Sequence, residues 1–146
     1  MNDEQIIQQA LSILERRICS GRLLSSSSET AKFLRLKLAT NDREVFAVIF
    51  LNNLHRVIAY EEMFFGTIDG SSVHPREVVK NALHHNASAV IFAHNHPAGV
   101  SEPSQADIQL TKRLTAALEL VTIRVLDHMV VSYGETTSFA ETGLLP

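Results

Sequence analysis

The chain has 146 residues, 45% of them hydrophobic and 20% charged, a balance typical of a soluble globular protein. We expect one domain over residues 1–146, with 1–26 as an N-terminal helix and lead-in, because a chain of this length buries a single core. The formal net charge of −3 gives no sign of the basic face typical of nucleic-acid binding, so nucleic acid is not an expected partner. Arg16, Arg17 and Arg22 cluster near the N-terminus, where a solvated helix end is expected and a local basic patch is the alternative.

Two helices are expected in the first forty residues. The second follows four serines and begins with Ser26-x-x-Glu29, which has the form of a capping box. The first, over residues 3–18, has one apolar stripe at helical spacing, and the second has a shorter apolar face. The stripe contains Ile6, Ile7, Ala10, Leu11, Leu14 and Ile18, and the second face contains Ala31, Leu34 and Leu38.

Strands and helices alternate from residue 44 onward. The apolar, β-branched run 44–51 predicts a strand buried on both faces, and 55–62 predicts a second strand. A helix then begins at Pro75 and buries Val78, Val79, Ala82 and Leu83. The remaining expected elements are a strand at 89–93, a helix at 104–121, one or two strands within 122–132, and a last strand near 136–139. This alternation predicts an α/β domain with helices packed on a central sheet.

The location predicted from the sequence is cytoplasmic. No apolar run approaches the roughly 20 residues that a membrane span requires, so no membrane partner is expected. The acidic N-terminus excludes a secretory signal, and the single cysteine, Cys19, suits a reducing compartment.

Two histidines and an aspartate carry the predicted chemistry. His94 and His96 follow a buried strand, and residues two apart on a strand point to the same face. Asp107 lies in the first turn of the next helix and can supply a third ligand. Two imidazoles and one carboxylate form the open ligand set of a catalytic zinc, which lowers the pKa of its water to roughly 7. We therefore predict one zinc ion and hydrolysis of an amide bond.

Two further residues complete this hypothesis. Ser104, one helical turn before Asp107, could donate a hydrogen bond to the oxyanion of a tetrahedral intermediate. A carboxylate close to the metal must act as the base, and the candidates are Glu44, Glu61, Glu62 and Glu77. Glu44 is favoured because it opens the most apolar strand, where a charge is costly.

Each part of the pattern also has an ordinary structural explanation. Ser104-x-x-Asp107 alone is typical of a capping box, and His94 and His96 alone could be loop histidines. Their combination at two strand–helix junctions favours a metal site. The absence of His-Glu-x-x-His and of Pro-Cys-x-x-Cys excludes a zincin and a zinc deaminase, whereas ferrous iron stays a minor alternative to zinc.

The other histidines are expected to have structural roles. We predict that His84 and His85 are exposed on a helix and that His55 lies on a strand surface. His74 is a candidate helix cap. His128 follows Asp127, and this pair either packs and forms a local hydrogen bond or supports the metal ligands from behind.

The motif Glu44, His94-x-His96-Pro97-x6-Ser104-x-x-Asp107 resembles the JAMM motif of JAB/MPN-domain metallopeptidases. The wider sequence is similar to the RadC family over about residues 27–142. The stretches that carry this resemblance are Arg43-Glu44-Val-Phe, Gly66-Thr67, Val73-His74-Pro75-Arg76-Glu77, Ala93-His94-Asn95-His96-Pro97-Ala-Gly99, Leu126-Asp127-His128 and Ser138-Phe139.

The resemblance implies a mixed, curved sheet flanked by helices, of cytidine-deaminase-like architecture. It also implies that His94, His96 and Asp107 bind zinc, that Glu44 is the general base and that Ser104 donates to the oxyanion. The chain is expected to be a short form without the helix-hairpin-helix region of longer RadC proteins. A protein or peptide is the implied substrate, with specificity in the loops 66–74 and 98–103.

Two other functions remain open at this point. One is a non-enzymatic, metal-binding protein-interaction module, and the other is an accessory protein of DNA repair, which only the family name suggests. The sequence does not identify the substrate or the oligomeric state.

Overall fold

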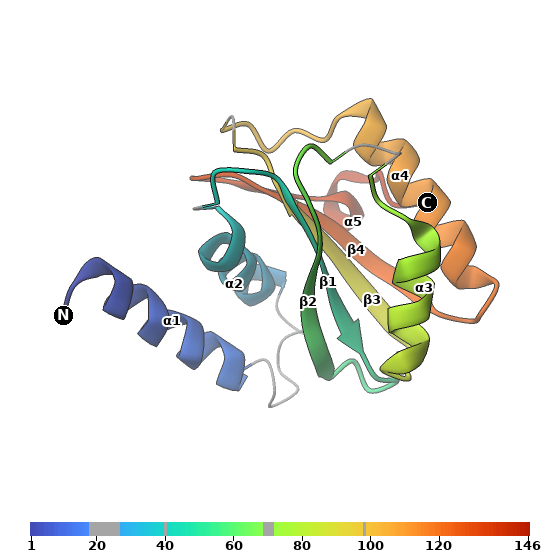
Figure 1. Cartoon of the computed structure of the whole chain (residues 1–146), viewed down its shortest axis with the longest axis horizontal. Helices are drawn as coiled ribbons and strands as arrows, with labels where there is room; N and C mark the ends of the chain where they lie inside the picture. Colours follow the sequence, from blue (N-terminus) through green and yellow to red (C-terminus); the bar gives the residue numbers. More distant parts are fainter. Residues whose placement is uncertain (18–26, 40, 69–71, 98) are drawn as a thin grey trace.

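Five strands form one mixed sheet at the centre of the molecule (Figure 1). This computed structural model describes residues 1–17, 27–39, 41–68, 72–97 and 99–146. The strands are β1 (Val45–Leu51), β2 (Val57–Phe65), β3 (Ala89–Asn95), β4 (Arg124–Val131) and β5 (Thr136–Ser138). They lie in the order β2-β1-β3-β4-β5, with β3 and β4 parallel and the other neighbours antiparallel. This sheet confirms the predicted fold class.

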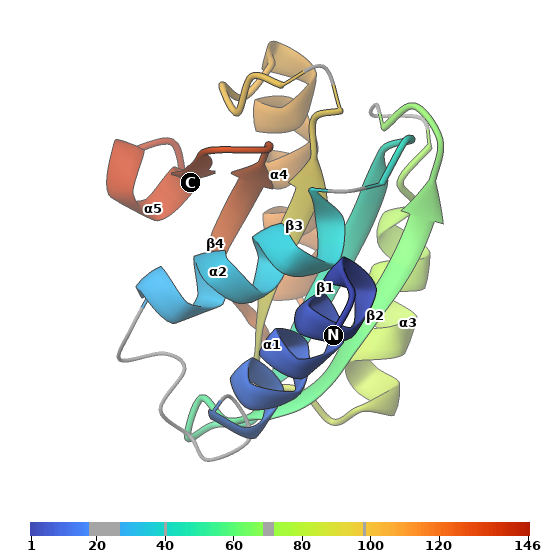
Figure 2. The same ribbon diagram turned by 90° about the vertical axis from the view of Figure 1, so that its left-hand side faces the viewer.

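Helices cover both faces of the sheet. Figures 1 and 2 show α2 (Ser27–Leu38) lying across one face, with α1 (Asp3–Arg17) beyond it. On the other face lie α3 (Pro75–His84) and α4 (Gln105–Glu119), and α4 is the crossover between the parallel strands β3 and β4. A short helix, α5 (Phe139–Thr142), follows β5.

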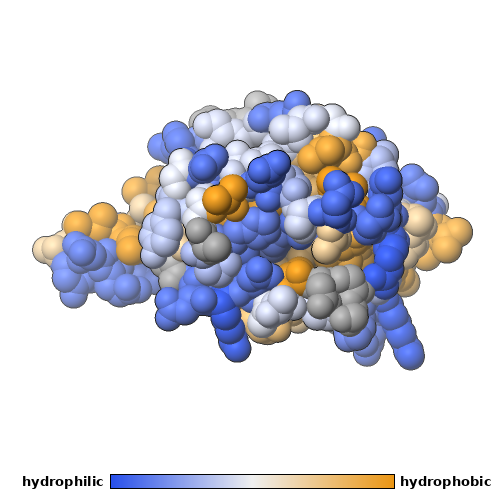
Figure 3. All heavy atoms as spheres, turned by 90° about the horizontal axis from the view of Figure 1, so that it is seen from above, coloured by the Kyte–Doolittle hydropathy of each residue, from blue (hydrophilic) through white to orange (hydrophobic). Residues whose placement is uncertain are grey.

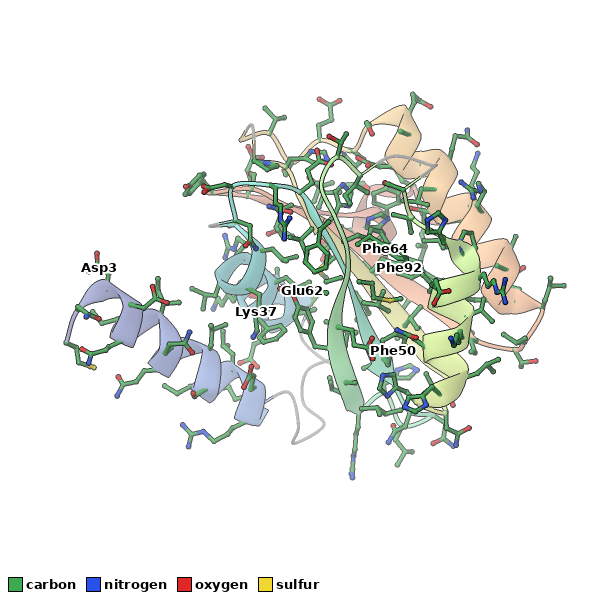
Figure 4. All side chains as sticks on the ribbon, viewed as in Figure 1. Asp3, Lys37, Phe50, Glu62, Phe64 and Phe92 are labelled. Carbon is green, nitrogen blue, oxygen red and sulfur yellow. The ribbon has the colours of Figure 1, made fainter. Side chains whose placement is uncertain are left out.

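The alternation of side chains along the strands divides the core in two. Ala47, Ile49 and Leu51 face α1 and α2, whereas Phe46, Val48 and Phe50 face α3 and α4. Figure 4 shows Phe50, Phe64 and Phe92 on the α3 side, while Lys37 and Glu62 lie toward α2. All seven residues of β1 and all seven of β3 are buried, which is consistent with the continuously apolar sequence of β1 and of residues 89–93 in β3.

Several element predictions differ from the structure. The second strand begins at Val57 rather than 55, because His55 has a φ of 61° in the turn that follows β1. Leu83 is 55% exposed, because it lies outside the stripe of Val78 and Ala82 that faces the sheet. Residues 124–131 form one continuous strand, and the last strand ends at Ser138 because α5 begins there. The predictions for Ile18, Cys19, Arg22 and Ser26 lie outside the described residues.

Predictions for three histidines also differ from the structure. His55 lies in the turn between β1 and β2 rather than on a strand surface. His85 is only partly exposed, because its ring packs 4.8 Å from that of Phe50 and its Nε2 forms a hydrogen bond with Glu61 Oε1. His74 occupies the N-cap position of α3, but its side chain makes no capping hydrogen bond.

The end of the sheet where β3 finishes and α4 begins carries the functional residues described below. Figure 3 views the molecule from that end and shows hydrophilic side chains interspersed with smaller hydrophobic patches. None of the helices in the described part of the chain combines the length and the apolar character needed to cross a bilayer.

Candidate metal centre

His94 and His96 owe their positions to the pleat of β3. His94 pairs with Phe46 on β1 and with Val130 on β4, and its side chain is fully buried on the α4 side. His96 lies just beyond the strand, where its backbone N–H still donates to the carbonyl of Val131 at 2.9 Å. The extended geometry therefore continues through both residues, and their rings come together on one face.

Asp107 reaches the same place from the first turn of α4. Ser104 and Asp107 form a reciprocal capping box, in which Asp107 N–H donates to Ser104 Oγ and Ser104 N–H donates to Asp107 Oδ2. The carboxylate is 3% exposed and is aimed at the two rings. The capping explanation and the metal-site explanation of this motif are therefore compatible.

The three side chains converge closely enough to share one ion. His94 Nε2 lies 3.1 Å from Asp107 Oδ1 and 3.0 Å from His96 Nε2, and His96 Nε2 lies 3.2 Å from Asp107 Oδ2. Tetrahedral ligands about 2.0–2.1 Å from a zinc ion would stand about 3.3 Å apart. The ligand atoms of these three residues and the distances between them therefore fit a divalent metal ion.

Electrostatics favour a cation at this point. Burial of the Asp107 carboxylate opposes its ionisation, but hydrogen bonds with His94 and His96 outweigh burial and hold its pKa well below the usual range. The hydrogen bond with Asp107 raises the pKa of His96, against a smaller opposing effect of burial. A negative charge fixed between two imidazoles attracts either a proton or a metal ion.

Hydrogen bonds orient both rings from behind. His96 Nδ1 lies 2.8 Å from the carbonyl oxygen of Val100, so Nδ1 carries the proton and Nε2 is left facing Asp107. His94 Nδ1 lies 2.8 Å from His128 Nε2, so His128 supports a predicted ligand from behind, which is one of the two roles considered for the Asp127-His128 pair. Complete burial, together with the nearby ring of His94, lowers the pKa of His128 well below its usual range.

Asp127 does not contact the His128 ring. Its carboxylate accepts hydrogen bonds from the backbone N–H groups of His128 and Ala140, and from the hydroxyl of Ser138 at 2.5 Å. Asp127 therefore anchors the start of α5 to β4. Both explanations for the Asp127-His128 pair therefore apply in part. Asp127 forms local hydrogen bonds, and His128 supports the predicted ligand His94 from behind.

Glu44 borders a cleft beside these residues. The cleft has a volume of about 490 Å³ and is lined by Glu44, Ile68, His96, Pro97, Val100, Glu102, Pro103, Ser104 and Asp107. Glu44 Oε2 accepts a hydrogen bond from the N–H of Ile68 at 2.6 Å, which fixes the carboxylate at this edge. The other predicted candidates, Glu61, Glu62 and Glu77, do not line the cleft.

The Ser104 hydroxyl accepts a hydrogen bond and can still donate its own proton. Its oxygen accepts the N–H of Asp107 at 3.1 Å, and its side chain lines the cleft. A hydroxyl has one proton to donate as well as its lone pairs, so acting as a cap leaves that proton available.

Part of the predicted specificity loops also borders the cleft. Residues 69–71 and 98 lie outside the described residues, but Ile68, Val100, Glu102 and Pro103 contribute to the lining. Ser101 ties the second loop to the β4–β5 hairpin through contacts of 3.2 Å with Glu135 and 2.9 Å with Thr137.

A mixed sheet flanked by helices, with one histidine near the end of β3, a second just beyond it and an aspartate in the first turn of α4, is consistent with a JAB domain. The chain belongs to the family described as "RadC-like JAB domain", whose model matches residues 24–144. The resemblance to the RadC family predicted from the sequence is thereby confirmed.

The curated relatives carry the name UPF0758 protein, which specifies no activity. One from Marinobacter nauticus is 57% identical over 139 residues, covering 95% of this chain and 62% of the relative. One from Cellvibrio japonicus is 59% identical over 143 residues, covering 95% and 64%. One from Vibrio cholerae is 52% identical over 143 residues, covering 98% and 90%. The chain thus spans less than two thirds of the first two relatives.

Proposed function

We propose that this chain is a zinc-dependent metallopeptidase or isopeptidase that hydrolyses an amide bond in a protein or peptide. The observation that carries the proposal is the meeting of His94 Nε2, His96 Nε2 and one Asp107 carboxylate within 3.0–3.2 Å of each other, at the edge of a cleft that also holds Glu44. Three protein ligands and a fourth position left for solvent or substrate are typical of catalytic zinc.

His94, His96 and Asp107 would hold the ion in this proposal. When bound, zinc supplies a Lewis acid that polarises a carbonyl group and makes water acidic enough to lose a proton near neutral pH. The ligand set carries one negative charge, so the occupied site keeps a net positive charge suited to a developing oxyanion.

Glu44 is the proposed proton carrier. The hydrogen bond from Ile68 occupies one carboxylate oxygen and leaves the other free to take a proton from water and deliver it to the leaving nitrogen. Ser104 would donate its hydroxyl proton to the oxyanion, a type of interaction that contributes on the order of 10²–10³ in rate. Ile68, Val100 and Pro103 give the cleft apolar walls that exclude water around a bound chain.

The proposal is tested by metal analysis and by a cleavage assay. Protein purified without added zinc should contain close to one zinc per chain, and His96→Ala should contain almost none. The zinc-loaded protein should generate new amino termini in a library of proteome-derived peptides and isopeptides, and Glu44→Gln should not. A zinc content near zero, or equal cleavage by wild type and Glu44→Gln, would overturn the proposal.

A further inference from the structure

A chain of buried hydrogen bonds runs behind His94, away from the cleft. His94 Nδ1 lies 2.8 Å from His128 Nε2, and His128 Nδ1 lies 2.5 Å from Thr111 Oγ1. Thr111 Oγ1 in turn donates to the backbone carbonyl of Asp107 at 2.8 Å, one turn earlier on α4. Thr111, His128 and His94 are each 0% exposed, so water does not compete for these groups.

With a neutral His128 ring, only one arrangement of protons satisfies all three contacts. The contact between Thr111 Oγ1 and a carbonyl oxygen is a hydrogen bond only if the hydroxyl proton lies between them. The hydroxyl then has only lone pairs for His128, so His128 Nδ1 carries a proton and donates it. If His128 is neutral, its Nε2 has a lone pair and must accept from His94 Nδ1.

The surroundings of His128 favour the neutral ring. It stacks on Phe139 at 4.6 Å and meets Phe46 and Phe92 edge-on at 5.7 and 5.9 Å. The neighbouring carboxylate of Asp127 is occupied by two backbone N–H groups and Ser138. A charged imidazole among aromatic rings without a directly paired carboxylate would be costly to bury.

The geometry points to Thr111 and His128 as positioning residues that fix the tautomer of His94. With its proton held on Nδ1, His94 presents the lone pair of Nε2 to Asp107 and His96, where the metal is proposed to bind. This inference rests on the proposed metal site but extends it to two side chains that make no contact with the cleft.

The hydrogen bonds from Thr111 through His128 to His94 are needed because Asp107 favours the opposite tautomer of His94. Asp107 by itself favours a proton on His94 Nε2, since its Oδ1 lies 3.1 Å away and would accept one. A proton there would block the nitrogen that faces the other ligands. The hydrogen bond to His128 opposes this preference, and Thr111 fixes the direction of that bond.

The first test reads the tautomer directly in the metal-free protein. Long-range ¹H–¹⁵N NMR correlations at mildly alkaline pH distinguish protonated Nδ1 from protonated Nε2 in each imidazole. Wild type should show His94 and His128 both protonated at Nδ1. In Thr111→Val, His128 loses its acceptor, and a substantial population of His94 should shift its proton to Nε2. His94 protonated at Nε2 in the wild type would overturn the inference.

The second test measures zinc affinity by competition with a chelator. Thr111→Val should weaken zinc binding 10–100-fold, the usual effect of losing a group that orients a ligand. Thr111→Ser keeps the hydroxyl and should restore nearly all of the affinity. Thr115→Val is the matched control, because Thr115 lies one turn further along α4 and its buried hydroxyl has no hydrogen-bond partner among the described residues. Equal affinities in Thr111→Val and Thr115→Val would overturn the inference.

Substitutions of His128 give an independent readout. His128→Gln offers an amide oxygen that can accept from His94 Nδ1, whereas His128→Leu offers none, so His128→Gln should bind zinc more tightly than His128→Leu. Identical affinities in two folded variants would contradict the inference. If wild type binds no zinc at all, the proposed function fails. The NMR measurement still decides whether Thr111 and His128 set the tautomer of His94.

Discussion

The buried side chain of Asn95 accepts a hydrogen bond from the backbone N–H of Val45 at 2.7 Å. The same amide donates to the carbonyl of Arg43 at 3.0 Å, so Asn95 holds the two residues that flank Glu44. Ile68 N–H donates to the Glu44 carboxylate itself. Glu44, the proposed base, is therefore held both through its neighbouring backbone groups and through its carboxylate. In the sequence, Asn95 lies between the two predicted ligands His94 and His96.

We predict that Asn95→Ala lowers both stability and turnover while zinc content stays near that of the wild type. The substitution leaves the buried N–H of Val45 without its acceptor, which costs about 1–3 kcal/mol. Urea denaturation measures the stability, and kcat of the zinc-loaded protein measures the displacement of Glu44. Asn81→Ala is the control, since Asn81 donates to Glu61 away from the cleft and should affect stability alone. Equal kcat values for the two variants would contradict a positioning role for Asn95.

Glu44→Gln should retain zinc and lose turnover. Glutamine keeps the shape of the side chain and can still accept from Ile68, but it takes up no proton, so the rate should fall by about 10²–10⁴. Metal content by mass spectrometry and single-turnover cleavage check the two parts separately. Glu77→Gln, on the exposed first turn of α3, should leave both unchanged. Loss of zinc from Glu44→Gln would mean that Glu44 is a ligand and that another group serves as the base.

Substitutions of Ser104 can separate its two roles. Ser104→Ala removes the cap of α4 and should cost about 0.5–2 kcal/mol of stability, whereas Ser104→Gly should cost only a few tenths. Both remove the hydroxyl proton, so both should lower kcat by about 10²–10³ if it stabilises the oxyanion. Thermal unfolding and steady-state kinetics provide the comparison. A kcat that follows stability, with the glycine variant near wild type, would leave Ser104 with the capping role alone.

The local features of the site could be predicted from the sequence. His94 and His96 are two residues apart on a strand, and Asp107 lies in the first turn of a helix, so short-range geometry determines where each side chain points. The core strand β1 could also be predicted, because all of its residues are buried and its sequence is continuously apolar.

The contacts behind the ligands depend on pairing between distant segments. His128 reaches His94 only because the parallel register of β3 and β4 places His128 beside Phe92, two residues before His94. Thr111 joins them through the packing of α4 on that strand. The local signals of this arrangement were the adjacent Asp127 and His128 and the spacing of Asp107 and Thr111, which is one helical turn. The partners of Asn95 likewise depend on pairing between β1 and β3, which residue patterns do not specify.

Zinc binding should strengthen as the pH rises through the titration of His96. The hydrogen bond with Asp107 raises the pKa of His96 in the metal-free protein above the ordinary value of 6.5. Because zinc binds the neutral ring, protons compete with it below that raised pKa. Zinc titrations between about pH 5 and pH 8, the range in which histidine changes charge, measure the effect. An affinity that is constant across this range would contradict the assignment of His96 as a ligand.

The same linkage gives the stability of the metal-free protein the opposite trend. A histidine whose folded pKa is raised contributes stability fully below its unfolded pKa of about 6.5, and this contribution is lost as the pH rises through the folded value. Chelator-treated protein should therefore lose stability with rising pH relative to His96→Gln, when thermal unfolding of both is followed.

Zinc at 100 times its Kd should add about 2.7 kcal/mol to the free energy of unfolding of the wild type. His96→Gln should gain little, because only two of the three ligands remain, and an equal gain in both proteins would place the metal elsewhere.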